Sequence, residues 1–458
     1  MAPPSKPRPP SVERLLAAVR PRLGDPPPGS EAVVAHAREV IGIERASLRA
    51  NGRTAPRAVD DLATDVLERL DGAADAWSAG LVPVINATGV IVHTNLGRAA
   101  WPRAAIDAAR AAAAEPLLLE LDRETGRRGR RYRAAEDLLV ALTGAEDALV
   151  TNNNAAALAL AVGLAGRGRG VAVSRGELVE IGGGVRIPDI VRRAGAKLVE
   201  VGTTNRTRAE DFADPLSDGR ASIVLRVHRS NFVMAGFTED PDAASLASLV
   251  RRAGAILVDD LGSGALLDTA RYGLAHEPMP AERLAGGADL VTFSGDKLVG
   301  GPQAGLIVGR ADLVARIRKD PLARAMRPDK VTLAAIAATL GLYVAGRATT
   351  HIPVWQAIAM PASDLRARAE ALAAAVPGAA VTQLESTVGG GSLPGETLLS
   401  WGIALAGSAS RLLRALRRGT PAVVGRIADG SVILDLRTVD PARDHDLAAA
   451  IRAAADSR

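Results

Sequence analysis

The feature that most constrains this chain is a repeated alternation of short apolar runs with alanine-rich segments, which begins near residue 82 and continues past residue 300. Each run is rich in β-branched residues and ends on glycine, asparagine or another polar residue. Strand, turn and helix in this order are typical of a mostly parallel sheet covered by helices on both faces, so we predict the α/β class. The eight predicted strands lie in VPVINATG, DALVTNNN, GVAVSRG, AKLVEVG, SIVLRVH, AILVDDLGSG, DLVTFSG and GLIVG.

The regions before and after this alternation predict further domains. Five prolines among the first ten residues predict a disordered start. We expect Ser11 to be the N-cap of a first helix, and two further helices at about residues 31–48 and 59–76. A further helix is expected at residues 362–375, with strands in AVTQLES, LLSWGIAL and SVILDLRTV. We therefore expect an N-terminal helical domain over residues 1–80, a large α/β domain over 81–345 and a smaller C-terminal α+β domain over 346–458.

Composition excludes several classes of protein. With 48% apolar and 23% charged residues the chain resembles ordinary globular proteins, and its 458 residues favour two or three domains. The absence of cysteine excludes disulfides and thiolate catalysis, and the six histidines are scattered, so we expect no metal. Neither a secretory signal nor an apolar run of about 20 residues is found, which predicts a cytoplasmic protein without a membrane span.

Charge is distributed unevenly near the N-terminus. Residues 1–57 hold ten Lys or Arg against five Asp or Glu, whereas residues 58–80 hold one against six. The basic part is the one that could contact phosphates, although many solvated helix faces have the same composition.

Polar residues follow the predicted strands at their carboxyl ends, where parallel α/β sheets bind ligands. The most distinctive of them is the lysine in VTFSGDKLVGGPQAG, Lys297, which stands before an open glycine-rich loop. Such a lysine can anchor pyridoxal phosphate as a Schiff base, and Ser294 could contact the cofactor phosphate. Alone, the motif also fits a solvated lysine after a strand. The residues at the strand ends are Thr88, Asn152, Asn153, Asn154, His228, Asp260 and Lys297.

Two other strand ends could complete a cofactor site. Asn152, Asn153 and Asn154 open a helix whose first amide groups could cradle a phosphate, although an N-cap cluster explains them equally well. Asp260 begins the DLGSG turn and could pair with the pyridine nitrogen, whereas Asp259 could cap a turn or face solvent.

Arginines supply candidate anion sites. Arg98 lies among small residues and turn formers, and Arg324 and Arg327 are three apart on a predicted helix, where they would share a face and could bind an oxyanion. A surface arginine is the alternative for Arg98. Residues 123–133 hold six arginines, which could contact a polyanion or form a solvated loop.

In chain order, the asparagine turn, Asp260 and Lys297 match the aspartate aminotransferase-like, fold type I pyridoxal phosphate enzymes. The whole chain resembles bacterial selenocysteine synthases, the L-seryl-tRNA(Sec) selenium transferases, most specifically in SRGELVEIGG and SGDKLVGGPQAG. The other segments that carry the resemblance include VINATGVIVHTNLGRA, TGAEDALVTNNNAAA, YGLAHEPMP, PLARAMRPDK and VVGRIADGSVILDLR.

This resemblance implies pyridoxal 5'-phosphate as cofactor and a reaction on serine esterified to tRNA(Sec). The serine would form an aldimine that displaces Lys297, lose its α-proton and β-hydroxyl to give aminoacrylyl-tRNA, and accept selenium from selenophosphate. Arg98, Arg324 and Arg327 match positions expected to hold the selenophosphate. The resemblance further implies tRNA binding by the N-terminal helices and a homo-oligomer, a ring-shaped pentamer of dimers.

Two positions depart from the family pattern, and two other functions compete with it. Val185 stands where an aromatic residue is common before RIPD, and Phe232 stands where a tyrosine is common after SN, which removes a hydroxyl. The first competitor is a pyridoxal phosphate lyase acting on a small amino acid or amino sugar acid, for which a basic N-terminal module has no evident use. The second is an RNA-binding protein without catalysis, which the presence of Lys297 and Asp260 disfavours.

Overall fold

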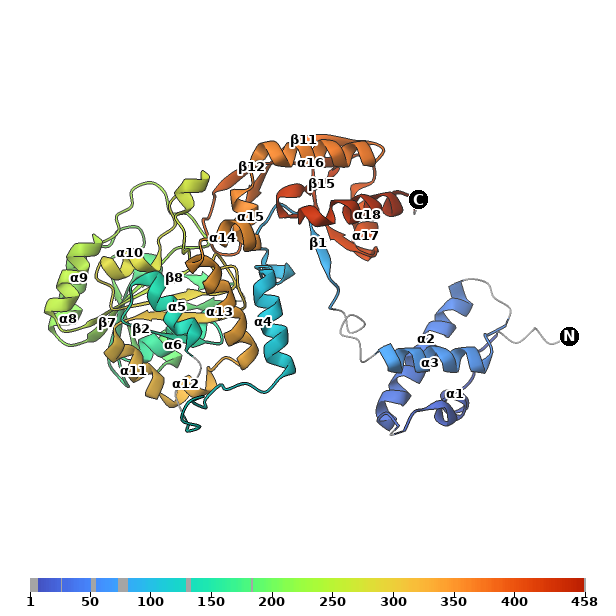
Figure 1. Cartoon of the computed structure of the whole chain (residues 1–458), viewed down its shortest axis with the longest axis horizontal. Coiled ribbons are helices and arrows are strands. Elements are labelled where there is room, and N and C mark those ends of the chain that lie inside the picture. Colours follow the sequence, from blue (N-terminus) through green and yellow to red (C-terminus); the bar gives the residue numbers. More distant parts are fainter. Residues whose placement is uncertain are drawn as a thin grey trace. The chain divides into compact units, whose positions relative to one another are not determined.

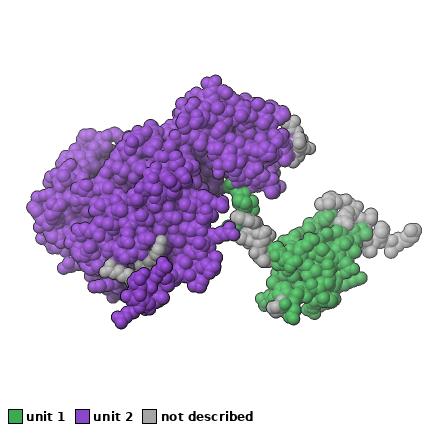
Figure 2. Space-filling view, in the orientation of Figure 1, with its two compact units in different colours: residues 1–84 green, residues 85–458 purple. Residues whose placement is uncertain are grey.

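The computed structural model describes residues 7–25, 27–50, 55–72, 81–128, 133–182 and 184–456. The chain separates into two compact units, Met1–Val84 and Ile85–Arg458 (Figure 2). The predicted bounds of the N-terminal helical domain, residues 1–80, stay a prediction beside this division. A boundary between residues 345 and 346 stays a prediction, because the second unit spans both sides of it.

The first unit is built from three helices around a small apolar core. Ser11 accepts a hydrogen bond from the Arg14 amide at 3.2 Å, which confirms it as the N-cap of the first helix. The core joins leucine and valine side chains from all three helices, among them Leu15, Val40 and Leu62. The helices are α1 (Val12–Val19), α2 (Ser30–Ala50) and α3 (Val59–Gly72). The prolines at positions 1–6 and residues 73–76 of the third predicted helix lie outside the described residues.

A seven-stranded sheet forms the centre of the second unit and confirms the predicted α/β class (Figure 1). Six strands are parallel to one another, and β10 runs antiparallel between β2 and β9. In spatial order the strands are β2 (Asp147–Thr151), β10 (Gly305–Gly309), β9 (Leu290–Ser294), β8 (Ile256–Gly262), β7 (Ala221–Val227), β3 (Gly170–Ser174) and β6 (Lys197–Val201).

Both faces of this sheet are buried, because successive residues of a strand enter different apolar cores. On β10, Leu306 and Val308 belong to one core together with Trp355, whereas Ile307 belongs to another with Leu158. This burial explains why the strands are continuous apolar runs. The helices of this region are α4 (Arg103–Ala114), α5 (Ala134–Thr143), α6 (Asn154–Gly163), α7 (Ile187–Arg193), α8 (Ala213–Ser217), α9 (Ala243–Arg252), α10 (Pro280–Ala285), α11 (Ala311–Lys319), α12 (Pro321–Ala325), α13 (Lys330–Val344), α14 (Ala348–His351) and α15 (Pro353–Ala359). A two-stranded hairpin, β4 (Glu180–Ile181) with β5 (Val185–Arg186), precedes α7.

One of the eight predicted strands is misplaced. The run VPVINATG supplies only β1 (Val84–Asn86), which pairs with β13 (Ala422–Val424) and not with the central sheet. Thr88 is accordingly not at the ligand edge of that sheet. Its hydroxyl instead donates to Asn86 Oδ1 at 2.7 Å and accepts from the Val90 amide at 3.1 Å.

The C-terminal part is a four-stranded antiparallel sheet with three helices and an apolar core of its own, as its predicted α+β composition requires. The predicted helix at residues 362–375 is confirmed as α16. The strands, in spatial order, are β11 (Ala379–Thr387), β12 (Thr397–Leu405), β15 (Ser431–Asp435) and β14 (Arg426–Ala428), and the helices are α16 (Ala362–Ala375), α17 (Ala409–Arg418) and α18 (Asp444–Asp456). Across the described part of the chain, no helix combines the length and apolarity needed to span a membrane.

Candidate active site

A cavity of about 460 Å³ opens at the carboxyl ends of β8 and β9, beside the first turn of α6. Its position agrees with the edge at which parallel α/β sheets bind ligands. The cavity brings together six of the nine predicted site residues. These are Arg98, Asn153, Asn154, Asp260, Ser294 and Lys297.

Lys297 follows the buried end of β9 and is only 7% exposed. Burial, and secondarily the positive charge of Arg98, lowers the pKa of its amine, which favours the neutral form needed for a nucleophile. Gly391 (φ +80°) lies against this amine, since a Cβ there would stand 3.0 Å from Lys297 Nζ. Glycine therefore leaves space around the reactive nitrogen.

The loop after Lys297 is fastened to the core by two aromatic side chains. Tyr343, on α13, places its hydroxyl 3.0 Å from the Leu298 carbonyl and 2.9 Å from the Val299 carbonyl. Trp355, on α15, donates its indole N–H to the Leu298 carbonyl at 2.9 Å and to the Tyr343 hydroxyl at 2.6 Å. These contacts satisfy carbonyls that would otherwise be buried without partners, and they fix the backbone that carries the lysine.

Asp260 lies in the cavity, and its neighbour Asp259 lies on the other face of β8. Oδ1 of Asp260 accepts hydrogen bonds from Asn154 Nδ2 at 2.8 Å and Thr292 Oγ1 at 2.9 Å. Oδ2 has no such bond among the described residues and stays available to a ligand. Burial raises the pKa of the Asp260 carboxyl, which the two hydrogen bonds partly oppose. Asp259 lines a different cavity and lies 3.5 Å from Arg283 Nε.

The three asparagines have three different environments. Asn153 is the N-cap of α6 and accepts from the Ala156 amide at 2.9 Å, as the alternative interpretation of this segment predicts. Asn154 orients Asp260, and its own Oδ1 is buried without a hydrogen-bond partner among the described residues. Asn152 is exposed and does not line the cavity; its amide donates to the Met326 carbonyl at 2.9 Å.

Arg98 is held at the cavity by an acidic neighbour of the lysine. Its guanidinium lies 2.7 Å from Asp296 Oδ2, and the two side chains are 33% and 9% exposed. Arg98 adopts a left-handed backbone (φ +64°) directly after Gly97. The side chain is thus an accessible cation beside Lys297.

Arg324 and Arg327 are not brought to this cavity within one chain. They line a separate cavity of about 560 Å³ near α12. The predicted shared helix is wrong, because α12 ends at Ala325 and Arg327 stands directly before Pro328, which disfavours helical backbone at the preceding residue. Arg327 Nη2 lies 2.9 Å from Glu120 Oε1.

The arginine-rich segment 123–133 lies partly outside the described residues, which omit 129–132. Two of its described members make ion pairs within the chain. Arg128 Nη2 lies 3.1 Å from Glu120 Oε2, and Arg133 Nη2 lies 2.8 Å from Asp147 Oδ1.

Several cavity residues were assigned no function in the sequence analysis, although His228 was among the polar residues expected at the strand ends. His228, at the end of β7, has its Nδ1 3.6 Å from Glu277 Oε1, and both side chains are largely buried. Gly390 and Gly391 line the cavity from a segment almost 100 residues beyond Lys297. The strand-end position of His228 was a usable signal, but the glycine triplet is placed by tertiary contacts alone.

Of the two departures from the family pattern, only Val185 is among the residues that line the cavity. Val185 lines the cavity and is 42% exposed, and Phe232 is 38% exposed. No described hydrogen bond of the cavity depends on either side chain.

Comparison with known proteins places the chain in a family. The family model for L-seryl-tRNA selenium transferase matches residues 84–440. The L-seryl-tRNA(Sec) selenium transferase of Rhizobium meliloti (strain 1021) is 45% identical over 443 residues, 93% of each chain, and that of Moorella thermoacetica is 44% identical over 454 residues, 96% of this chain and 95% of the relative. Among solved structures, D-glucosaminate-6-phosphate ammonia-lyase shares the fold, with a TM-score of 0.59, 23% identity, and coverage of 83% of this chain and 98% of that one. The chain belongs to the L-seryl-tRNA selenium transferase family.

Proposed function

We propose that this protein converts L-seryl-tRNA(Sec) to L-selenocysteinyl-tRNA(Sec), with pyridoxal 5'-phosphate as cofactor and selenophosphate as selenium donor. The observation that carries the proposal is the 45% identity to a selenium transferase over 93% of both chains. Similarity of this length includes the N-terminal unit as well as the cavity. The proposal therefore covers both the chemistry and the tRNA substrate.

The cavity residues fit pyridoxal phosphate. The amine of Lys297 is buried and has a lowered pKa, as a Schiff-base lysine requires. Asp260 keeps Oδ2 available for a protonated ring nitrogen, and the buried Asn154 Oδ1 is an acceptor that lacks a partner in the described structure. The first turn of α6 and Ser294 supply donors for a phosphate. When bound, the cofactor supplies an electron sink for the carbanion at the substrate α-carbon.

The chain's own groups then handle protons and charge. The neutral Lys297 amine takes the α-proton of the seryl group and holds it within reach of the departing β-hydroxyl, which leaves as water. Asp260, fixed by Asn154 and Thr292, stabilises positive charge on the ring nitrogen. Asp296 orients Arg98 toward an anion beside the reacting carbon.

Arg324 and Arg327 join this proposal through the homo-oligomer. We propose that the protein forms a ring-shaped pentamer of dimers, in which a second subunit contributes Arg324 and Arg327 to the selenophosphate site. Arg98 comes from the subunit that carries Lys297. A mixture of Lys297→Ala subunits with Arg324→Ala/Arg327→Ala subunits should then recover activity that neither variant has alone. No recovery in verified mixed oligomers would contradict a shared site.

The function is tested by product analysis. The purified protein is incubated with seryl-tRNA(Sec) and selenophosphate, and the amino acid is released from the tRNA and identified. Selenocysteine is the expected product, with seryl-tRNA(Ser) as the matched control substrate. Serine recovered unchanged from both tRNAs, with cofactor bound, would contradict the proposal.

The competing lyase function has weaker support. The similarity to D-glucosaminate-6-phosphate ammonia-lyase is at 23% identity and shows the fold alone. The basic helices of the first unit have a use in tRNA binding and none in the turnover of a small amino acid. We further propose that the reaction takes place in the cytoplasm, where aminoacyl-tRNA is used.

A further inference from the structure

Two chain segments reach the Lys297 cavity from strands outside the central sheet, one from β1 and one from β11. The first, residues 86–98, ends at Arg98, and the second, residues 386–391, ends at Gly390 and Gly391. Both therefore form part of the cavity wall. Neither belongs to the central sheet that carries Lys297.

The two segments are hydrogen-bonded to each other and form one strap. The Thr387 amide donates to the Gly89 carbonyl at 2.8 Å, and the Ile91 amide donates to the Thr387 carbonyl at 3.0 Å. The Val92 amide then donates to the Val388 carbonyl at 2.8 Å. A displacement of one segment must move the other.

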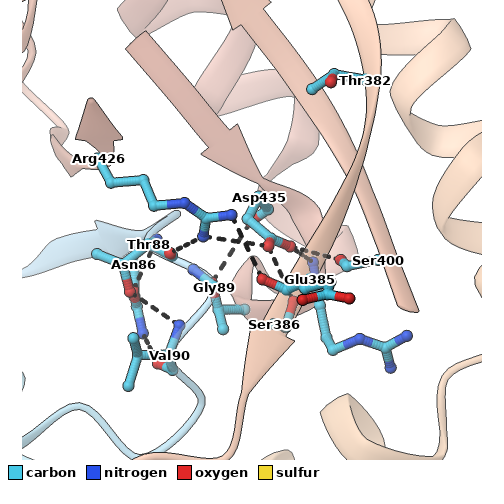
Figure 3. Close-up of polar contacts among 12 residues, drawn as sticks. Asn86, Thr88, Gly89, Val90, Thr382, Glu385, Ser386, Ser400, Arg426 and Asp435 are labelled. Atoms are coloured by element: carbon cyan, nitrogen blue, oxygen red, sulfur yellow. Dashed lines mark hydrogen bonds and ion pairs between the residues drawn. The ribbon is translucent and has the colours of Figure 1, made fainter. Parts of the chain in front are cut away.

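The far end of this strap is held by Asp435, which is fully buried at the end of β15 (Figure 3). Its Oδ2 accepts from Ser386 Oγ at 2.9 Å, and its backbone amide donates to the Ala87 carbonyl at 2.9 Å. One residue thus binds the start of both segments. Its Oδ1 faces the sheet, where it accepts from Ser400 Oγ at 2.6 Å.

Arg426 and Gly89 make this attachment tight. Arg426 Nη1 lies 3.5 Å from Asp435 Oδ2 and donates to the Thr88 carbonyl. Gly89 (φ +79°) passes directly over the pair, because a Cβ there would lie 2.4 Å from both Arg426 Nη1 and Asp435 Oδ2. Only glycine allows the first segment to approach the ion pair so closely.

We propose that Asp435 is a positioning residue, which acts through the strap to place Arg98 and the Gly390–Gly391 backbone for binding of the anionic substrate. Lys297 is held separately, by Tyr343 and Trp355. Disturbing Asp435 should therefore weaken anion use while cofactor attachment at Lys297 is retained. The inference rests on the proposed function for the identity of the anion, selenophosphate.

Two serines provide matched variants, since both are buried and donate to the same carboxylate. Ser386→Ala removes the link to the strap, whereas Ser400→Ala removes a link inside the sheet. We expect Ser386→Ala and Asp435→Asn to raise the KM for selenophosphate about fivefold or more. This is the size of effect expected when one hydrogen bond to a charged group is lost. Ser400→Ala should leave that KM within about twofold, and all three should keep the visible absorbance of lysine-bound cofactor.

Amide hydrogen exchange supplies a readout that does not depend on activity. Faster exchange in residues 89–98 and 386–391 is expected for Ser386→Ala but not for Ser400→Ala. Equal KM values and equal exchange in the two serine variants would overturn the inference, even if the wild type is active. If the wild-type protein transfers no selenium, the proposed function is refuted. The hydrogen-exchange comparison of Ser386→Ala with Ser400→Ala then tests by itself whether Asp435 holds the strap.

Discussion

His228 is a titratable group of the cavity whose surroundings favour its neutral form. Burial, and then the positive charges of Arg283 and Arg229, lowers its pKa from 6.5 to about 4. Its Nδ1 is buried and has no hydrogen-bond partner among the described residues. The folded protein therefore resists protonation of a ring that the unfolded chain protonates freely.

This shift predicts an acid-sensitive fold. As pH falls from about 6.5 to 4, His228 is protonated in the unfolded chain but stays neutral in the folded one. The free energy of unfolding therefore falls by on the order of 3 kcal/mol. His228→Gln should show a flatter dependence of the unfolding free energy on pH in this window. Denaturant titrations of both proteins at several pH values measure it, and parallel pH profiles would contradict the assignment.

At the level of elements, the glycine-rich loop after β9 depends on its attachment to α13 and α15. Tyr343 and Trp355 bind the Leu298 and Val299 carbonyls in a fully apolar surrounding. In such surroundings a carbonyl without a partner is costly. The position of Lys297 is thus set by side chains that lie far beyond it in the sequence, on α13 and α15.

Removing the Tyr343 hydroxyl should loosen this loop. Tyr343→Phe is expected to lower the unfolding free energy by about 1–3 kcal/mol and to reduce kcat, because backbone acceptors lose a donor. The matched control is Tyr272→Phe. The centroids of the Tyr272 and Trp355 rings are 5.7 Å apart, but the Tyr272 hydroxyl makes no hydrogen bond to the Leu298 or Val299 carbonyl. Equal stability and activity in the two variants would count against the anchor.

Local sequence patterns predicted most of the central sheet and selected three residues that line the cavity. Seven of the eight predicted strands form that sheet, because runs buried on both faces leave a strong apolar signal. VPVINATG has the same local signal, and only its pairing with β13 distinguishes it. Lys297, Asp260 and Arg98 were found from spacing and motif. Gly391 and Asp435 were not, because they contact the site or the strap through segments that are distant in sequence.

At the scale of the whole molecule, the two units have separate cores. The apolar core of the first unit contains only residues before 85, and the cores of the second contain none of them. A protein that lacks residues 1–80 should therefore fold and bind cofactor. We expect it to lose tRNA affinity by about tenfold or more, since we propose that the basic helices supply phosphate contacts. Filter binding measures this loss, and unchanged affinity would remove the tRNA-binding assignment from the first unit.

The central claim is that selenium transfer takes place at Lys297. Its most direct test compares wild type, Lys297→Ala and the control Lys197→Ala, which changes an exposed lysine at the start of β6, in the assay that identifies the amino acid released from tRNA(Sec). Wild type and Lys197→Ala should yield selenocysteine and show the visible absorbance of lysine-bound cofactor, whereas Lys297→Ala should yield only serine and lack that absorbance. Selenocysteine formed by Lys297→Ala at the wild-type rate would contradict the claim.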